Sequence, residues 1–417
     1  MNGFDENGVR FDVRLGEPIL LRQLPTGHVV SIPAALDDEP VFRLPPVIVD
    51  QASVSLPLAE TIDWGVKLFG IPDLWLKSTG KNCRVAILDT GVDDTHPDLQ
   101  GAIKDVADFT RSQSGYVDSH GHGTHCAGVV AARHNDAGVV GVAPEAELYC
   151  GKVLGDNGSG TSTMIADGIR WAMDKGCHVI SMSLGSSQPT PESYEMIKAA
   201  TKAGIVIVAA AGNEGPRANT VGYPAMYPEV VAVGAIDQQK RITSFSSRGP
   251  AVDICAPGNQ ILSTVPNRDY AVMSGTSMAT PFVAGVIALM WERNNQFASN
   301  GQLTLAATVL QHLKATAVDA GDAGFDPNYG NGLINPAWLL ALMNPNVVVP
   351  IVLTSASFTE AGLKALLMRL KAGQQYLGYF PIGAAGEKVP VVIDLTQAPE
   401  SGVPVVTLPP GFVNPFA

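Results

Sequence analysis

Basic residues are scarce in this sequence of 417 residues. Lys and Arg together number 27 against 39 Asp and Glu, which gives a formal net charge of −12. No stretch gathers Lys or Arg into the cluster that a nucleic-acid-binding protein needs to meet the phosphate charge. Nucleic acid is therefore excluded as an expected partner.

Long apolar runs are also absent. No run reaches the roughly 18 residues that a membrane-spanning helix requires, so no membrane partner is expected. The N-terminus, Met1 to Arg10, is polar and acidic and lacks the basic start and apolar run of a secretory signal. This absence favours a cytoplasmic location, and a secreted one stays open if a leader has been removed.

Cysteines are few, and their spacing fits neither a disulfide framework nor a zinc ribbon. Of the five, Cys83, Cys150, Cys177 and Cys255 each lie in or beside a short apolar run. These positions predict buried free thiols that act as small hydrophobic side chains. Unpaired thiols also favour a reducing compartment, in agreement with a cytoplasmic location.

Apolar residues and glycines are abundant: 46% of the residues are hydrophobic and 43 are glycine. Between residues 83 and 334, strand-like apolar runs alternate with helical patterns, which is typical of a parallel sheet covered by helices on both faces. We therefore expect a three-layer α/β fold. The expected strands are 84–88, 147–153, 179–183, 205–210 and 230–235, and the expected helices are 123–132, 163–175, 191–203 and 277–291.

Two flanking segments differ from this central pattern. Residues 1–55 contain several prolines and short β-type segments, which suit a propeptide, an inhibitory arm or a dimerisation arm through which the chain interacts with itself. Residues 346–417 are interpreted as a small α/β or β-rich appendage. The expected organisation is thus an N-terminal extension, a main domain over residues 56–345 and a C-terminal appendage.

Four motifs of the main domain carry side chains suited to acyl transfer. Asp89 follows a buried apolar strand, at the carboxyl end where parallel sheets bind ligands. His122 lies between two glycines before a small-residue helix, where an imidazole can move protons near neutral pH. Ser277 opens the most apolar helix, whose N-terminal N–H groups can stabilise an oxyanion. Asn213 ends another strand, in A-G-N-E-G, and offers an amide to the same charge.

The same motifs leave other classes of protein open. His120, His122 and His125 form an H-x-H-x-x-H spacing similar to the zinc motif of metallo-β-lactamase-like hydrolases, although Thr124 stands at the place of the usual second-metal Asp. The triplet D-T-G at Asp89 is also found in aspartic proteases, and its single copy would require a symmetric dimer. A non-catalytic binding protein is a third alternative, which the complete set of four polar side chains disfavours.

In this order, D-T-G, H-G-T-H, A-G-N-E-G and G-T-S-M-A-T-P resemble the subtilisin-like serine proteases, or subtilases, over roughly residues 60–343. The H-G-T-H-C pattern that ends at Cys126 is similar to that of the thiol-containing proteinase K and thermitase branch. The resemblance implies a serine endopeptidase that forms an acyl-enzyme on Ser277, with His122 as general base and then acid. It also implies that Asp89 orients the imidazole and that Asn213 binds the oxyanion. A specialised peptide transferase or processing protease on this fold is the alternative.

The resemblance further implies where a protein or peptide substrate binds. The substrate would lie as an added strand between two backbone edges. The pocket for the residue before the cut, P1, has small walls that admit large apolar side chains, so broad specificity with that preference is expected, and Glu214 at the rim would tolerate a basic one. The residues concerned are Gly158, Ser159 and Gly160; Ser183, Leu184 and Gly185; and Ala210, Gly212 and Gly222.

Calcium is the cofactor that the resemblance implies, in a structural role. Hard oxygen ligands suit this ion. The alternative is a solvated acidic loop without an ion. The ligands would be the side chains of Glu60, Asp98 and Asn135 and the backbone oxygens of Arg133, Ala137 and Val139.

Overall fold

The computed structural model describes residues 41–54, 59–293 and 305–337 and, outside these ranges, eight strands near the two ends of the chain. The chain divides into two compact units, Met1–Val41 and Phe42–Ala417. Residues 42–54 of the expected N-terminal extension therefore belong to the larger unit.

Each end of the chain carries a four-stranded sheet of its own. The N-terminal strands form an antiparallel meander, and the C-terminal strands pair in chain order, with the first pair parallel and the others antiparallel. The strands are β1 Asn2–Phe4, β2 Arg10–Asp12, β3 Pro18–Gln23 and β4 Val29–Pro33, and β19 Val348–Val352, β20 Gln375–Ile382, β21 Glu387–Asp394 and β22 Val405–Thr407.

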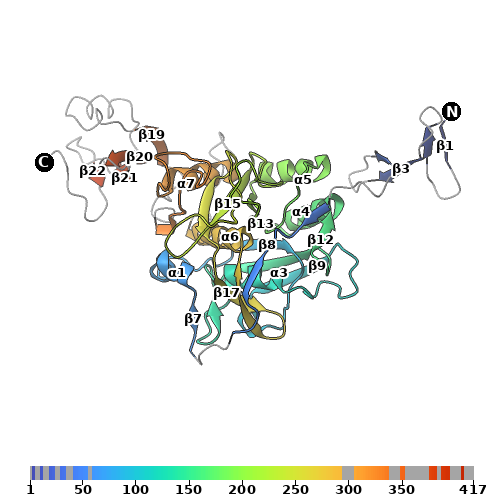
Figure 1. The fold of residues 1–417 in the computed structure, drawn as a ribbon, viewed down its shortest axis with the longest axis horizontal. Coiled ribbons are helices and arrows are strands. Elements are labelled where there is room, and N and C mark those ends of the chain that lie inside the picture. The colour runs from blue at the N-terminus through green and yellow to red at the C-terminus, as the bar shows by residue number, and fades with distance from the viewer. Residues whose placement is uncertain are drawn as a thin grey trace. The chain divides into compact units, whose positions relative to one another are not determined.

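A seven-stranded parallel sheet forms the centre of the larger unit (Figure 1). Its order is β16-β15-β14-β13-β8-β11-β9, and every neighbouring pair runs parallel. β14 and β15 are buried at every residue, as expected for strands covered on both faces. The strands are β8 Arg84–Asp89, β9 Ile103–Asp108, β11 Glu147–Lys152, β13 Val179–Met182, β14 Val206–Ala210, β15 Val230–Ile236 and β16 Ile254–Pro257.

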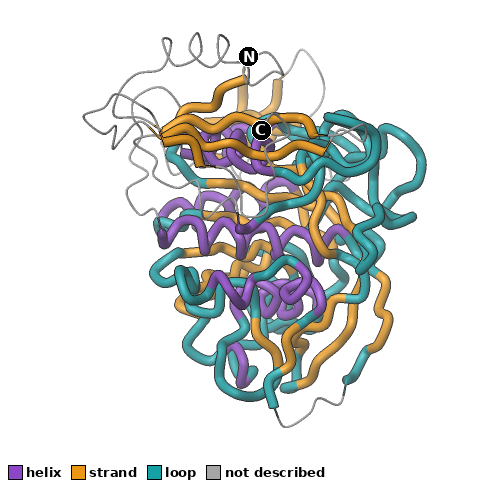
Figure 2. Tube along the Cα trace, turned by 90° about the vertical axis from the view of Figure 1, so that its left-hand side faces the viewer, coloured by secondary structure: helices purple, strands orange, loops and turns teal. Residues whose placement is uncertain are grey.

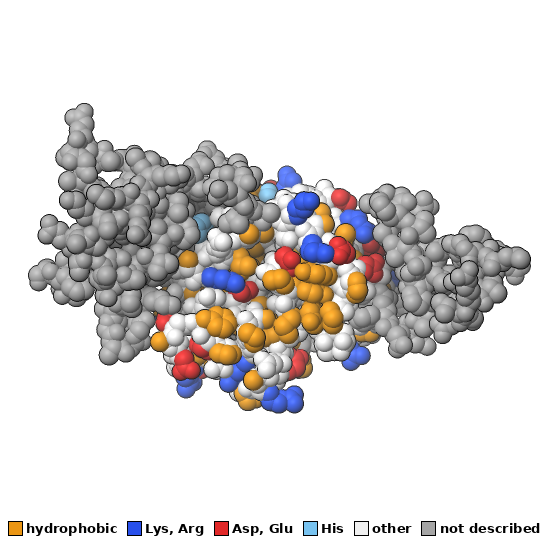
Figure 3. All heavy atoms as spheres, turned by 90° about the horizontal axis from the view of Figure 1, so that it is seen from above, with side chains coloured by type: hydrophobic (Ala, Val, Ile, Leu, Met, Phe, Trp, Pro, Cys, Tyr) orange, Lys and Arg blue, Asp and Glu red, His pale blue; other side chains and the backbone are white. Residues whose placement is uncertain are grey.

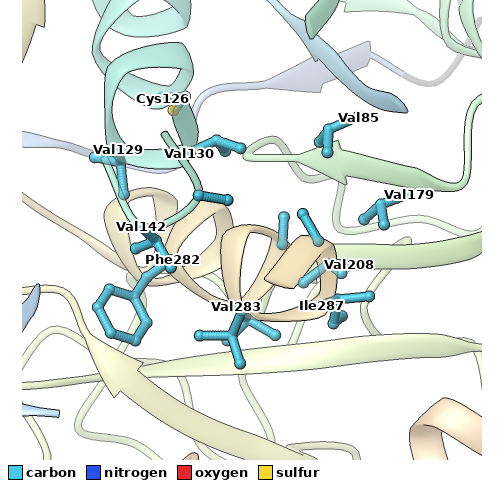
Figure 4. Packing of buried hydrophobic residues seen from close by; sticks show 14 of the residues in the cluster. Val85, Cys126, Val129, Val130, Val142, Val179, Val208, Phe282, Val283 and Ile287 are labelled. Carbon is cyan, nitrogen blue, oxygen red and sulfur yellow. The ribbon is translucent and has the colours of Figure 1, made fainter. Parts of the chain in front are cut away.

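One face of this sheet is covered by α3 (His122–Ala131) and α6 (Thr276–Arg293). Val85, Val179 and Val208 point to this face and join the apolar side chains of the two helices in one buried cluster, which Figure 4 shows around α6. α6 is apolar on all sides, which is typical of a helix in the interior.

The opposite face is covered by α4 (Ser162–Asp174) and α5 (Pro191–Lys202). Ala86, Ile180 and Ile207, each adjacent in sequence to one of the valines above, point the other way and join a second buried cluster. Figure 2 shows helices and strands of the larger unit running alongside one another in layers. The three-layer α/β fold predicted from the sequence is confirmed.

Three small sheets and several short helices complete the larger unit. β5 pairs with β12, β7 with β10, and β18 lies between β17 and β6. α7 packs against α5 and β14. The elements are β5 Val41–Arg43, β6 Ile48–Gln51, β7 Thr61–Ile62, β10 Val139–Val140, β12 Ser159–Thr161, β17 Ile261–Val265, β18 Asp269–Ser274, α1 Trp64–Leu68, α2 Ile71–Leu74, the 3₁₀ turn Pro97–Leu99 and α7 Leu305–Thr316.

All five cysteines are buried free thiols, which confirms the prediction made for Cys83, Cys150, Cys177 and Cys255 from their apolar surroundings. In the part of the chain that the structure describes, no helix combines the length and the apolar character needed to cross a bilayer. On the face drawn in Figure 3, Lys and Arg side chains are scattered among acidic and neutral ones and form no continuous basic patch.

Candidate active site

Asp89 and His122 lie in direct contact at the carboxyl end of the central sheet. Asp89 is the last residue of β8, and His122 is the first residue of α3. Oδ1 of the carboxylate and Nδ1 of the imidazole are 2.7 Å apart, and both side chains are 1% exposed. Nε2 of the imidazole has no hydrogen-bond partner among the described residues, which leaves it free to face a nucleophile.

Two glycines allow β8 and α3 to approach this closely. Gly123 packs on the carbonyl oxygen of Gly91, and a Cβ atom at residue 123 would lie 2.2 Å from that oxygen. Gly91 has a φ of +109°, a conformation that favours glycine. The D-T-G and H-G-T-H motifs thus meet backbone against backbone, and this contact sets the distance between the carboxylate and the imidazole.

Burial and the neighbouring carboxylate act in opposite directions on the pKa of His122. Burial disfavours the imidazolium, but the charge of Asp89, with smaller contributions from Cys126 and from the Asp89 hydrogen bond, outweighs it and holds the pKa well above its ordinary value of 6.5. The imidazole is therefore a stronger base than a histidine exposed to water.

Ser277 is brought to the same place by α6, of which it is the second residue. Its carbonyl oxygen accepts hydrogen bonds from the Ser183 hydroxyl at 2.8 Å and from the Cys126 thiol at 3.5 Å. That thiol also lies 3.9 Å from Nδ1 of His122 and so connects the two residues. The Ser277 hydroxyl is buried, and in the described part of the chain its hydrogen bond, at 3.5 Å, goes to the carbonyl oxygen of Ser183 and not to His122.

The side-chain amide of Asn213 is held in one orientation. Its Oδ1 accepts hydrogen bonds from the backbone N–H and the hydroxyl of Thr276, both at 2.9 Å, so Nδ2 must point the other way. Nδ2 donates to the carbonyl oxygen of Pro46 at 3.0 Å. Nδ2 and the backbone nitrogen of Ser277 lie on the same side of Gly275, because a Cβ atom at residue 275 would be 3.1 Å from the first and 3.6 Å from the second.

The three histidines of the H-x-H-x-x-H spacing do not converge on one point. Nε2 of His125 lies 3.1 Å and 3.2 Å from two backbone carbonyl oxygens, and burial lowers the pKa of this imidazole to about 3. The ring centroids of His120 and His122 are 6.3 Å apart. Among the described residues, one cluster has the spacing of metal ligands, and it combines His122 with Asp89 and Cys126. The geometry therefore favours proton transfer by His122 over a three-histidine zinc site.

A segment of the chain itself lies along the predicted substrate-binding edges. The N–H and C=O groups of Gly185 both pair with Arg43 at 2.8 Å, and the carbonyl oxygen of Gly158 accepts from the N–H of Leu44 at 3.1 Å. β12, which contains Ser159 and Gly160, pairs with β5. This segment thus forms an added strand between the two edges.

The small residues predicted to form the P1 pocket also come together. The N–H of Gly222 donates to the carbonyl oxygen of Ala211 at 3.1 Å, and the N–H of Gly212 donates to the Thr276 hydroxyl at 3.2 Å. The opposite wall, Ser183–Gly185, is held to Ser277 by the Ser183 hydroxyl. Both walls are therefore anchored to the two residues at the start of α6.

The segment before residue 48 reaches further into the site. Phe42 is fully buried and joins the same apolar cluster as Leu154 and Ile165. Pro45 is buried, and Pro46 supplies the carbonyl oxygen that Asn213 meets. The sequence pattern singled out the prolines of this segment but gave no sign of its position, because its partners lie more than a hundred residues away in the chain.

The predicted calcium ligands gather around the carboxylate of Asp98, which is 1% exposed. Its two oxygens accept hydrogen bonds from the N–H of Val139 at 2.8 Å and from Nδ2 of Asn135 at 3.2 Å, and the Asn135 N–H donates to Glu60 at 3.1 Å. In the described ranges, no Lys or Arg forms an ion pair with Asp98. Tyr270 forms a further side-chain hydrogen bond with Asp98. A buried carboxylate that has no Lys or Arg partner, and that Asn135 links to the carboxylate of Glu60, is chemically suited to a hard cation.

Comparison with known proteins agrees with this geometry. The model of the Subtilase family matches residues 80–332, more than half of the chain. The chain belongs to the subtilase family. The M-protease of Shouchella clausii (strain KSM-K16) is 41% identical over 319 residues, which cover 76% of this chain and 80% of the relative. Subtilisin Savinase of Lederbergia lenta is 44% identical over 278 residues, which cover 66% of this chain and 98% of the relative. Subtilisin E of Bacillus subtilis (strain 168) is 40% identical over 316 residues, or 74% and 80%.

This subtilase is accordingly a serine endopeptidase, a hydrolase that acts on protein or peptide substrates. Calcium binding is typical of the family. The finer placement beside proteinase K and thermitase, which rests on Cys126, stays a prediction.

The raised pKa of His122 predicts an enzyme that works best in alkaline solution. His122 must be neutral to accept the proton of Ser277, so kcat/KM should fall as the pH drops through its pKa in the folded enzyme, which lies above 6.5. Rates with a peptide p-nitroanilide from about pH 5 to about pH 10 test this, and the acidic limb should have its midpoint above the ordinary histidine value. A flat profile, or a midpoint below that value, would contradict the role of His122.

Proposed function

We propose that Asp89, His122, Ser277 and Asn213 carry out the peptide-bond hydrolysis of this serine endopeptidase. The observation that supports the proposal most strongly is the buried 2.7 Å hydrogen bond between Asp89 and His122, beside Ser277 and an oriented amide. Asp89 ends β8, Asn213 lies in the loop after β14, and the other two residues lie in the first turns of α3 and α6, which is how a parallel α/β sheet assembles a site.

Acylation begins when Oγ of Ser277 attacks the carbonyl carbon of the substrate while its proton moves to Nε2 of His122. The carbonyl oxygen becomes an oxyanion, which accepts hydrogen bonds from Nδ2 of Asn213 and from the Ser277 N–H. His122, oriented by Asp89, gives the proton to the leaving amine as the C–N bond breaks. A water molecule then loses a proton to the same imidazole and attacks the acyl-enzyme, and the ester bond breaks as Oγ regains that proton.

The cleft supports broad specificity with a preference for large apolar side chains at P1. Apart from Leu184, which is fully buried, the residues of the two walls, Ser183–Gly185 and Ala210–Gly212, have small side chains, and Gly222 at the base has none. Glu214 is exposed at the rim, where Oε2 accepts from the Ser247 hydroxyl at 2.9 Å, and its charge would tolerate a basic side chain.

Asn213→Ala removes a donor that acts mainly when the oxyanion forms. It should lower kcat by about 10²- to 10³-fold with little change in KM, a magnitude that is known from the matching donor of a subtilisin. Steady-state kinetics with a peptide p-nitroanilide measure this effect. Gln238→Ala, which removes an exposed amide, serves as the control and should leave kcat unchanged.

Phenylmethylsulfonyl fluoride tests the nucleophile in the same enzyme. Complete sulfonylation of Ser277, followed by mass spectrometry, should abolish casein cleavage, and Ser277→Ala should neither react nor cleave. Casein cleavage that survives complete sulfonylation would overturn the assignment.

We further propose that residues 42–47 are an inhibitory arm. The arm uses the hydrogen bonds that an extended substrate would use: Arg43 pairs with Gly185, and Leu44 bonds to Gly158. Its Pro46 carbonyl receives the Asn213 amide, and its Phe42 ring is buried. A substrate strand and the arm would compete for the same backbone groups, so the arm must leave or be cut before catalysis.

Phe42→Ala should weaken this arm. Burial of a phenylalanine contributes about 2 to 3 kcal/mol, so the rate at which phenylmethylsulfonyl fluoride modifies Ser277 should rise at least about tenfold. The rate is followed by mass spectrometry on the full-length chain, which also shows that the arm is intact. Val49→Ala, at a residue that is 54% exposed, is the control. Equal rates for Phe42→Ala and the unmodified chain would contradict the inhibitory role.

We also propose that the cluster around Asp98 holds a calcium ion. The ion would compensate the charge of this buried carboxylate and tie the loop 133–139 to it, a structural role with no part in the chemistry. Its ligands would be the side chains of Glu60, Asp98 and Asn135 and the backbone oxygens of Arg133, Ala137 and Val139.

Removing calcium should therefore destabilise the enzyme. At a free concentration about 100 times its Kd, calcium stabilises the folded chain by about 2.7 kcal/mol, so the Tm should fall in EGTA and recover when calcium is added back. Asp98→Asn should lose this response, and Asp322→Asn, at an exposed carboxylate, should keep it. A Tm of the unmodified chain that is the same in EGTA and in calcium would contradict the proposal.

A further inference from the structure

Lys152 is a fully buried lysine beside the active site. It ends β11, where it pairs in register with Asp89 of β8. Its ammonium group has three acceptors: the carbonyl oxygen of Thr90 at 2.5 Å, the carbonyl oxygen of Val117 at 3.3 Å and Oδ1 of Asp156 at 2.9 Å. Three N–H groups thus meet three oxygen atoms.

Each of these acceptors belongs to a different part of the active site. Thr90 directly follows Asp89, so the position of its carbonyl group is coupled through the backbone to the position of the Asp89 carboxylate. Val117 directly precedes Asp118, at the start of the segment that leads into α3. Asp156 lies in the loop that leads into β12, one of the two edges along which a substrate lies.

Asp118 extends the second of these connections to His122. This carboxylate is 1% exposed and accepts hydrogen bonds from the Thr90 hydroxyl and from the N–H groups of Gly121 and Thr124, each at 2.8 Å. The latter two residues lie on either side of His122 at the start of α3. A shift of the Thr90 or Val117 carbonyl group would therefore change the positions of both Asp89 and His122.

A charged side chain in this position does not serve packing. Removing an ammonium group from water is costly, and well-packed apolar replacements of buried ion pairs are often equally or more stable. A methionine of similar length would fill the same space without that cost. The positive charge instead attracts three oxygen atoms and so fixes the positions of the segments that carry them.

We propose that Lys152 is a positioning residue for acyl transfer. Its ammonium group holds the segments of Asp89, His122 and the substrate edge at set separations, and it touches no reacting atom. The proposal rests on the roles proposed above for Asp89 and His122. It separates two effects: the bonds to Thr90 and Val117 govern kcat, and the bond to Asp156 governs KM.

Lys152→Met keeps an unbranched side chain and removes the ammonium group. For the full chain in its active form, kcat per reactive Ser277 should fall about tenfold to 100-fold, as expected when catalytic groups are slightly misplaced. Lys175→Met breaks the partly exposed ion pair with Asp105 and is the matched control, with kcat and KM unchanged. A kcat for Lys152→Met within about twofold of the unmodified enzyme overturns the proposal.

Asp156→Asn tests the third connection, because it removes the charge that faces Lys152 and keeps the bonds to Thr90 and Val117. Oδ1 of Asp156 also accepts a hydrogen bond from the Ser114 hydroxyl at 2.7 Å, so Ser114→Ala is measured beside it and should leave KM unchanged. Asp156→Asn should raise KM by about three- to tenfold and leave kcat within about twofold. An unchanged KM overturns the proposal. This variant also carries the test if Lys152→Met does not fold, since Asp156 is 39% exposed in a loop.

Asp89→Asn, measured in the same series, distinguishes a failure of the catalytic assignment from a failure of the positioning role alone. If Asp89→Asn stays fully active, the proposed catalytic assignment fails, and the positioning role fails with it. If Asp89→Asn is inactive and Lys152→Met is fully active, only the positioning role of Lys152 fails.

Discussion

A carboxylate and an imidazole, both closed off from solvent, share one hydrogen bond where β8 meets α3 (Figure 1). Each side chain would be costly in the interior alone, and each supplies the partner that the other needs. Their 2.7 Å separation depends on Gly123, because any side chain there would collide with the Gly91 carbonyl and push the helix off the strand. The raised pKa of His122 and the free position of its Nε2 both follow from this contact.

The remainder of the site is built largely from backbone groups and from side chains with fixed partners. Thr276 orients the amide of Asn213, and the edges at Gly158 and Gly185 offer N–H and C=O groups to an extended chain. Donors arranged in advance need no reorganisation when charge develops, which makes them effective in catalysis. The same backbone groups pair with an extended segment of this chain, residues 42–47, at Arg43 and Leu44.

The centre of this arrangement is predictable from the sequence, and its long-range contacts are not. β14 and β15 are unbroken apolar runs, and small residues surround Asp89 and Ser277, so local patterns indicate both. β9 is not predicted because three of its six residues are charged, which an edge strand tolerates with one side in solvent. The contacts of Lys152 with Thr90 and Val117, and those of the proposed inhibitory arm, join segments distant in the chain, and no local pattern marks such contacts. A lysine at the end of a strand is ordinarily exposed.

The proton between Asp89 and His122 is the most direct measure of the pairing on which the site depends. In the ¹H NMR spectrum of the enzyme with ¹⁵N-labelled histidine, the Nδ1–H proton of His122 should give a strongly downfield resonance. This resonance should persist in Ser277→Ala and disappear in Asp89→Asn. An unmodified enzyme without it, or an Asp89→Asn variant that keeps it unchanged, would contradict the pairing.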